Sequence, residues 1–127
     1  MTTFGPDFLA LQVRDLEVAA TFFEQHLGMT RAASAPPGAI VFDTSPVAFA
    51  VREPLPGVDL ATALPRPGLG VAMWFGVDDA DALHARLRRA DVEVLGAPAD
   101  SPFGRTPSFV GPEGYVLTAH TVDPTRP

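Results

Sequence analysis

The 127-residue chain contains no cysteine and no lysine. Without cysteine it can form no disulfide bond, present no thiolate nucleophile and hold no metal through sulfur ligands. Without lysine it cannot form a Schiff base between a lysine amine and a carbonyl substrate. The nine basic residues are therefore all arginines, and two common routes of covalent catalysis are excluded.

Long apolar runs and an excess of positive charge are also missing. No apolar stretch approaches the roughly 18 residues of a membrane span, and the segment from Met1 to Phe4 lacks a basic stretch followed by an apolar one. These absences predict a soluble cytoplasmic protein with no membrane partner. The net charge of −6 and the pI near 4.8 would repel phosphate backbones, so nucleic acid is not expected as a partner.

Apolar residues make up 46% of the chain, which also has 11 glycines and 14 prolines. This length and apolar content suffice for one compact domain, since domains typically have roughly 100–150 residues. Residues 1–127 are therefore expected to form a single domain, in which prolines and glycines separate short elements.

A strand followed by a helix cap occurs twice in the chain. Phe8–Asp15 is predicted to be a short strand that ends at a capping aspartate, and Ala72–Asp79 repeats the pattern. The shift from Asp15 to Asp79 is 64 residues, half of the chain. Such a repeat indicates a fold built from two equivalent modules.

A helix is predicted after each of these strands. The first is expected between Asp15, its N-cap, and Gly28, its stop. Its predicted apolar stripe consists of Val18, Phe22 and Leu27. The second helix begins after Asp78 or Asp79 and continues through Ala90. Its apolar face carries two leucines four positions apart, Leu83 and Leu87.

Three further strands are predicted after each helix. In the first half they are 29–33, 38–43 and 47–53, and in the second half 92–95, 106–111 and 115–121. Residues 54–70 contain four prolines and no strand pattern, so they are expected to be a linker. The predicted fold class is therefore α+β, with βαβββ modules at 7–53 and 71–121.

The duplicated unit, together with a Gly-Pro-Glu-Gly-Tyr turn at 111–115 before the last strand, resembles the vicinal oxygen chelate superfamily. This family comprises glyoxalases, extradiol dioxygenases, fosfomycin-resistance enzymes and bleomycin-resistance proteins. The resemblance extends from about Phe8 to His120. It implies two βαβββ modules whose mixed sheets curl into a cup that holds a ligand, and the fold alone does not decide what the cup does.

Metal-dependent members of this family carry His, Gln or Glu ligands on the first and last strands of each module. The resemblance places these positions at Phe8 and Ala72 on the first strands, and at Thr118 on the last strand of the second module. In the first module the last-strand position falls on Ala48 or Ala50. None of these residues is a usual ligand for a divalent cation, so neither a metal nor another cofactor is expected.

The three histidines do not rebuild such a site. His26 and His84 are expected on the exposed faces of the helices, whereas His120 lies on a strand that can direct it toward the cup. A single histidine with no carboxylate at ligand spacing is more often hydrogen-bonded than metal-bound.

Strand alternation assigns side chains to the two faces of each sheet. The face predicted to pack under the helices consists of Leu9, Leu11, Val13, Val47, Phe49, Val51, Met73, Phe75, Val77, Leu117 and Ala119. The face predicted to line the cup consists of Phe8, Ala10, Gln12, Ala48, Ala50, Arg52, Ala72, Trp74, Gly76, Val116, Thr118 and His120. Mostly apolar walls with a few polar groups are typical of a ligand pocket.

Several of the candidate side chains have two interpretations. Trp74, the only tryptophan, either stacks on a planar ligand or fills the space that a metal site would occupy. Phe8 is either a ligand wall or part of the core, and Arg52 is either a ligand contact or a solvated strand end. Phe103 and Arg105 lie in a loop hinged by a glycine, which forms either a lid over the ligand or an ordinary surface turn.

These features predict a non-catalytic protein that binds and sequesters a hydrophobic or aromatic natural product or antibiotic. The model for this function is self-resistance in the bleomycin-resistance branch, which also implies a homodimer with ligand grooves at its interface. The predicted ligand-binding residues are Phe8, Gln12, Ala48, Ala50, Arg52, Trp74, Phe103, Arg105, Thr118 and His120. No catalytic and no metal-ligating residue is predicted.

Two alternatives stay open. The acidic charge would also suit a cationic glycopeptide drug, whose binding would then depend steeply on salt. The chain could instead be an enzyme of natural-product metabolism, a lyase, isomerase or dioxygenase. Such an enzyme would use a metal bound by other residues, or metal-free acid–base chemistry with His120 and either Asp43 or Gln12. The sequence also leaves open whether the modules pair within one chain or swap between two.

Overall fold

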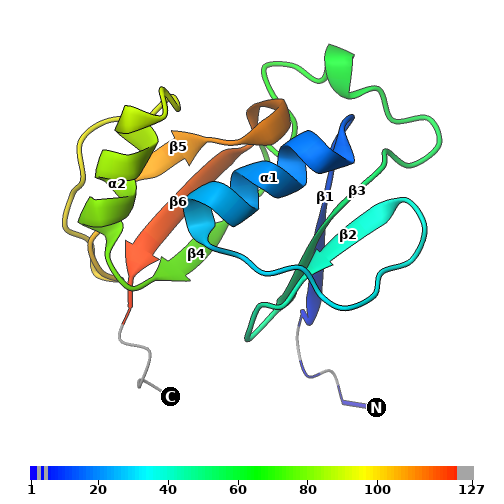
Figure 1. Ribbon diagram of the computed structural model, residues 1–127, viewed down its shortest axis with the longest axis horizontal. Coiled ribbons are helices and arrows are strands. Elements are labelled where there is room, and N and C mark those ends of the chain that lie inside the picture. The colour runs from blue at the N-terminus through cyan, green and yellow to red at the C-terminus, as the bar shows by residue number, and fades with distance from the viewer. Residues whose placement is uncertain (3, 5, 123–127) are drawn as a thin grey trace. The chain divides into compact units, whose positions relative to one another are not determined.

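The computed structural model describes residues 1–2, 4 and 6–122. The chain divides into two compact units, Met1–Thr62 and Ala63–Pro127. The division falls inside residues 54–70, where the structure contains a short 3-10 helix, η1, at Leu60–Thr62. Within the described residues, each unit has one α-helix and one three-stranded sheet (Figure 1). None of the helices in the described part of the chain is long and apolar enough to cross a membrane.

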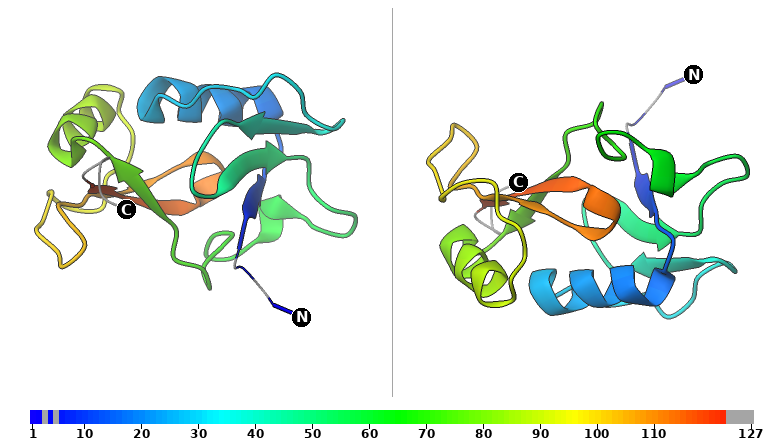
Figure 2. Two further views of the ribbon diagram at one scale, coloured as in Figure 1. Left: turned by 90° about the horizontal axis from the view of Figure 1, so that it is seen from below. Right: turned by 90° about the horizontal axis from the view of Figure 1, so that it is seen from above.

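The first unit contains, in chain order, β1 (Phe8–Gln12), α1 (Leu16–Leu27), β2 (Ala39–Phe42) and β3 (Ala48–Arg52). Its sheet has the order β1-β3-β2, with β1 parallel and β2 antiparallel to the central β3. A parallel pair needs a long connection between its strands, and here α1 and β2 supply it. Both views in Figure 2 show α1 beside β2 and β3, the two strands on which it packs.

The second unit contains β4 (Trp74–Val77), α2 (Ala80–Arg89), β5 (Ser108–Val110), the 3-10 helix η2 (Pro112–Gly114) and β6 (Val116–Thr121). Its sheet has the order β4-β6-β5, with β4 parallel and β5 antiparallel to the central β6. The two units therefore share one topology. This result confirms the predicted α+β fold of two related modules.

The segments directly after the two helices were predicted to be strands, and this prediction is wrong, because each contains only an isolated bridge. Segments 29–33 and 92–95 each contribute one isolated bridge, Arg31 to Phe42 and Val94 to Phe109. Prolines lie shortly beyond both segments. Because proline has no N–H to donate to a ladder, the pairing is interrupted near these residues. In the second unit a further isolated bridge, Ala99 to Thr106, follows Pro98. Each module therefore has three strands, with a bridged segment after its helix in place of the fourth.

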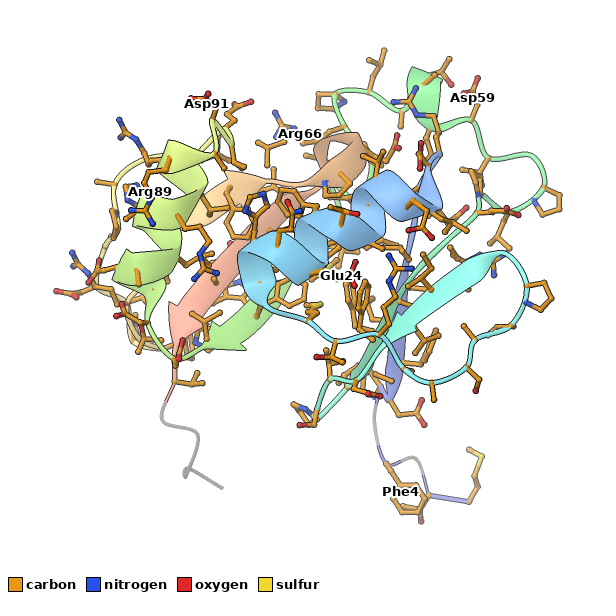
Figure 3. All side chains as sticks on the ribbon, viewed as in Figure 1. Phe4, Glu24, Asp59, Arg66, Arg89 and Asp91 are labelled. Atoms are coloured by element: carbon orange, nitrogen blue, oxygen red, sulfur yellow. The ribbon has the colours of Figure 1, made fainter. Side chains whose placement is uncertain are left out.

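Both α-helices begin at an aspartate N-cap. The carboxylates of Asp15 and Asp79 each accept a hydrogen bond from the backbone N–H three positions on, at 3.1 and 3.0 Å. Helix α1 ends as predicted at Gly28, whose φ of 65° is left-handed. Helix α2 ends at Arg89, one residue earlier than predicted, and the chain then turns through Asp91, with a φ of 57° (Figure 3).

The buried face of α1 differs from the predicted stripe. Val18 is 66% exposed. The buried residues are Ala19, Ala20 and Phe23. The two alanines allow the helix to approach the sheet closely, and Phe23 fills the space between the helix and the sheet. The Phe23 ring lies 5.0 Å from that of Phe49, which stacks at 6.0 Å on Phe42. An aromatic cluster is therefore the core of the first unit.

Arg31 ties the bridged segment of the first unit to α1. Its guanidinium donates hydrogen bonds to Glu17 at 2.8 Å and to Glu24, labelled on α1 in Figure 3, at 3.0 Å. The hydrogen bond from Arg31 lowers the pKa of Glu17 below its ordinary value. Exposed ion pairs of this kind contribute little to stability. They do fix where the chain runs after the helix.

The core of the second unit follows the prediction on α2 and β6, whereas Met73, Phe75 and Val77, also predicted to pack under the helix, are half-buried. Leu83 and Leu87 of α2 are buried, as are Leu117 and Ala119 of β6. The alternate residues of β6 are half-buried: Val116, Thr118 and His120. Since successive side chains of a strand point to opposite faces, one face of β6 packs under α2. The other face carries the polar side chains.

Candidate functional site

Three aromatic rings gather on the second unit. The Trp74 indole lies 5.9 Å from the Phe103 ring and 5.3 Å from the His120 imidazole, with interplanar angles of 81° and 76°. Trp74 is 44% exposed and Phe103 65% exposed. We call Trp74, Phe103 and His120 the Trp74 cluster. Large aromatic side chains that stay this exposed are candidates for contact with a ligand.

The strand register places two members of this cluster. In the parallel pair β4–β6, Trp74 lies opposite Thr118, and Gly76 lies opposite His120. Trp74, Thr118 and His120 therefore share the face of the sheet that α2 does not cover. On the other side of β6, Ser108 pairs with Thr118, and their hydroxyls are hydrogen-bonded at 2.8 Å.

Ser108 is the site residue that the sequence interpretation missed. Its hydroxyl belongs to a polar row, Ser108–Thr118–Trp74, that crosses the whole sheet. The sequence carried a signal for it, because the apolar Phe109 next to it is a candidate for the core, and alternation then turns Ser108 to the opposite face. In the structure, Phe109 is fully buried. A mutual hydrogen bond between two hydroxyls uses one of their two hydrogens, so one hydroxyl hydrogen of the pair can still be donated.

The loop that carries Phe103 is held in one conformation by its own hydrogen bonds. The Ser101 hydroxyl donates to the Gly104 carbonyl at 2.5 Å and accepts from the Phe103 N–H at 3.2 Å. Gly104 has a φ of 109°, and a Cβ at this position would collide with the Thr121 carbonyl of β6. Only glycine therefore allows the loop to lie this close to the strand.

Arg105 anchors the same loop to α2. Its guanidinium donates to Asp81 at 3.2 Å and to Asp100 at 3.1 Å. These hydrogen bonds, the one to Asp81 foremost, raise the pKa of Arg105 above its ordinary value. The Arg105 backbone carbonyl also accepts from the Thr121 N–H at 2.9 Å. Arg105 was predicted to contact the ligand, but in this structure its guanidinium is hydrogen-bonded to two carboxylates.

His120 connects the strand to the loop. Its Nδ1 lies 2.6 Å from the carbonyl oxygen of Phe103. The structure therefore brings together five side chains that share one unit. They are Trp74, Phe103, His120, Thr118 and Ser108, the first four of which were predicted from the sequence.

The candidate residues of the first unit form rows across the β1–β3 pair. Phe8 lies opposite Ala48, Ala10 opposite Ala50 and Gln12 opposite Arg52. Phe8 is 54% exposed, whereas Ala50, on the central strand between two neighbours, is buried. On a central strand, a small side chain has larger side chains of two adjacent strands beside it on the same face, and these can cover it.

The two polar candidates of the first unit have backbone partners. The Gln12 side-chain oxygen accepts from the Leu55 N–H at 2.8 Å. The Arg52 Nε donates to the Glu53 carbonyl at 3.0 Å. Both side chains therefore form hydrogen bonds with the backbone of the segment that follows β3, at Glu53 and Leu55.

The register also decides between Ala48 and Ala50 as the counterpart of Thr118. When the N-caps Asp15 and Asp79 are aligned, Ala10 corresponds to Trp74. Ala10 lies opposite Ala50, and Trp74 lies opposite Thr118. Ala50 is therefore the residue of the first module that corresponds to Thr118.

The residues at the family's metal positions do not fit a divalent cation. Phe8, Ala72 and Ala50 offer no donor atom, and the Thr118 hydroxyl is hydrogen-bonded to Ser108. Across residues 1–2, 4 and 6–122, no three His, Asp or Glu side chains cluster in a way that could hold a metal ion.

His26 and His84, expected on exposed helix faces, are half-buried, and the His26 ring packs 4.9 Å from Phe22.

Solved structures with the same fold include both binding proteins and enzymes. One is TnmS3, an antibiotic binding protein from Streptomyces sp. CB03234, with a TM-score of 0.74 and 23% identity over 97% of this chain and 99% of that chain. Another is lactoylglutathione lyase from Agrobacterium tumefaciens, with a TM-score of 0.66 and 18% identity over 95% of this chain and 96% of that chain. At such identities the likeness shows the fold alone.

A third solved structure, a glyoxalase/bleomycin resistance protein/dioxygenase from Nocardioides, has a TM-score of 0.69 and 24% identity over 99% of this chain and 88% of that chain. No curated protein matches the sequence significantly. The family model of the Glyoxalase/Bleomycin resistance protein/Dioxygenase superfamily matches residues 5–118. Together with the repeated module, this match shows that the chain belongs to the glyoxalase/bleomycin resistance protein/dioxygenase superfamily.

Proposed function

We propose that this protein binds and sequesters a hydrophobic or aromatic natural product, such as an antibiotic, without chemically changing it. The observation that carries the proposal is the Trp74 cluster, in which an indole and a phenyl ring stay 44% and 65% exposed beside a histidine and two hydroxyls. The antibiotic-binding function of TnmS3, which shares the fold, supports the same conclusion.

The physical basis of binding is the burial of aromatic surface. A planar ligand that covers Trp74 removes apolar area from water at about 25 cal/mol per Å². Stacking on the indole adds about 0.5–1.5 kcal/mol beyond the area term. Thr118 and Ser108 then supply a hydrogen-bonding edge that orients the ligand, as polar groups do in mostly apolar sites.

The same proposal assigns ligand contacts to part of the first unit. Phe8, exposed on the face of β1 that was predicted to line the cup, is the strongest candidate there. Ala48, opposite Phe8 on β3, would provide space beside it, whereas a contact with the buried Ala50 would need its cover to move. The Gln12 side-chain oxygen and the Arg52 Nε would contact a ligand only by exchanging the backbone hydrogen bonds that they now make.

We also propose that the protein acts in the cytoplasm as a homodimer, as the bleomycin-resistance branch of the family implies. Sedimentation velocity would then show a species with twice the chain mass of 13.4 kDa. A monomer at micromolar concentration, with and without a bound planar ligand, would contradict this part of the proposal.

Titration with alizarin, a planar hydroxylated anthraquinone, tests the proposed function. Trp74 is the only tryptophan, so quenching of the protein's emission reports directly on this site. If alizarin binds the folded state alone, it raises the free energy of unfolding by about 2.7 kcal/mol when its concentration is a hundred times Kd. The melting temperature then rises as well. A flat fluorescence titration and an unchanged melting temperature, with alizarin and with other planar polyaromatic antibiotics, would contradict the proposal.

The second candidate is an enzyme, which the lyase among the structural relatives and the histidine in the Trp74 cluster favour. Metal analysis separates a metal-dependent enzyme from a binding protein. Because the family's ligand positions hold Phe8, Ala72, Ala50 and Thr118, protein purified without chelators is expected to contain far less than one metal ion per chain. About one Ni, Fe, Mn or Zn per chain would contradict the proposed function.

A further inference from the structure

The hydrogen bond between His120 and the loop decides where the imidazole proton resides. The partner of His120 Nδ1 is the Phe103 carbonyl oxygen, at 2.6 Å. A carbonyl oxygen can only accept, so Nδ1 must carry the hydrogen of this bond. A neutral imidazole has a single N–H, and Nε2 is therefore left with a lone pair.

The loop cannot easily release this carbonyl. Ser101 fixes the turn around Phe103 through two hydrogen bonds, and Gly104 lies against β6 where no other residue fits. Arg105 then binds the loop to Asp81 of α2. The Ser101 hydrogen bonds and the close contact of Gly104 with β6 therefore hold the Phe103 carbonyl in front of Nδ1, while the exposed Arg105–Asp81 pair adds little. A carbonyl held in this position also holds the tautomer.

The lone pair of Nε2 is the acceptor of the cluster that lacks a partner among the described residues, and the Trp74 indole N–H is a donor that also has none. Among the described residues, His120 makes no hydrogen bond besides the one to Phe103. The imidazole stands at 76° to the Trp74 indole. A ring stacked parallel to the indole therefore cannot stack on the imidazole as well, and the interaction that His120 can offer it is a hydrogen bond at Nε2.

We propose that His120 selects ligands that carry a hydrogen-bond donor, a phenolic hydroxyl or a ring N–H, at the edge of a planar aromatic system. This inference rests on the proposed function and specifies the ligand class of the same site. A donor group completes the hydrogen bonding of His120. A ligand with only an acceptor there, such as an ether oxygen, would face the Nε2 lone pair and leave it unsatisfied. The loop is thus a support that orients His120, and the ligand class follows from that orientation.

Long-range nitrogen NMR of the ligand-free protein tests the tautomer directly. The chain has three histidines, and the His120 signals are identified by their loss in His120→Asn. The expected spectrum shows neutral His120 protonated at Nδ1. A spectrum with the hydrogen on Nε2 would overturn the inference and leave the proposed function standing.

Binding of β-naphthol and of its methyl ether tests the selection. The two compounds share one planar ring system and differ only at the oxygen, which carries a hydrogen in β-naphthol and a methyl group in the ether. In the native protein, calorimetry is expected to show β-naphthol binding about tenfold more tightly, the difference that one hydrogen bond makes. His120→Asn is the matched variant, because its amide N–H can still donate to the Phe103 carbonyl, while its amide oxygen takes the place of the ring Cδ2 and no acceptor stands at the place of Nε2. It should bind both compounds with equal affinity.

The outcomes separate the inference from the proposed function. Equal affinity of the native protein for both compounds would overturn the inference alone. The same preference for β-naphthol in His120→Asn would also overturn it, because another group would then accept the hydrogen bond from the naphthol hydroxyl. Failure of both compounds to bind, with no quenching of Trp74 by them or by alizarin, would overturn the inference and the proposed function together.

Discussion

Replacing Trp74 by alanine (Trp74→Ala) is expected to weaken the binding of alizarin by at least about tenfold, which corresponds to a loss of about 1.4 kcal/mol. The indole is the largest exposed ring of the Trp74 cluster, and its removal takes away both the stacking contribution and the apolar area that the ligand covers. Phe103, 5.9 Å away, cannot replace it because it stands at 81° to the indole plane.

Calorimetry is the suitable measurement for this variant, because it no longer contains the tryptophan whose fluorescence reports binding. Trp74→Phe keeps an aromatic face and should lose less affinity than Trp74→Ala. Val18→Ala is the matched control, since Val18 is an apolar residue, 66% exposed, on α1 outside the predicted site. Equal affinities of native protein and Trp74→Ala would show that Trp74 only fills space, and the stacking interpretation would be lost.

Phe23→Ala is expected to lower the free energy of unfolding by about 3–5 kcal/mol, the typical cost of truncating a fully buried phenylalanine. The Phe23 side chain is 0% exposed, and its ring contacts those of Phe22, Phe42 and Phe49. The cavity would lie between α1 and its sheet, where two alanines on the helix cannot fill it.

Equilibrium denaturation followed by circular dichroism measures this loss. Because a domain of this size is stable by only about 5–15 kcal/mol, Phe23→Leu serves as a second variant that keeps an apolar side chain and should lose less. Phe22→Ala is the comparison on the same helix, at a half-buried position, and should be milder than Phe23→Ala. If Phe22→Ala were the more damaging change, the predicted stripe through Val18 and Phe22 would describe the core better than the observed face does.

The helix ends and strand faces were predictable because they depend on local chemistry. An aspartate before an apolar segment satisfies the free N–H groups at a helix start, and both Asp15 and Asp79 do so. Alternation along β6 placed Leu117 and Ala119 under α2 and left Thr118 and His120 on the other face. These patterns need no knowledge of distant residues.

The buried face of α1 was not predictable in the same way. Two sets of apolar residues lie on this helix, and the larger side chains of Val18 and Phe22 suggested the wrong one. The helix buries Ala19 and Ala20 because close approach to the sheet favours small side chains, and this depends on what lies opposite. Composition of the helix alone carries no information about its partner.

The environment of His120 also depends on distant residues. Its Nδ1 partner, Phe103, lies 17 positions away in the chain, and the conformation of that loop depends on Ser101, on Gly104 and on the ion pairs of Arg105. The sequence identified His120 and Phe103 as separate candidates. Their contact, and with it the imidazole tautomer, required the three-dimensional arrangement.

The parallel pair in each sheet has a consequence for how the chain folds. Among the strands that the structure describes, β1 pairs with β3, and the whole of α1 and β2 lies between them in the sequence. Pairing over such a separation raises the contact order and slows folding. During synthesis, β1 has no partner until the ribosome has released Ala48–Arg52, and β4 waits likewise for Val116–Thr121. Each unit is complete only when its last strand has been made, and until then its first strand exposes an unpaired edge.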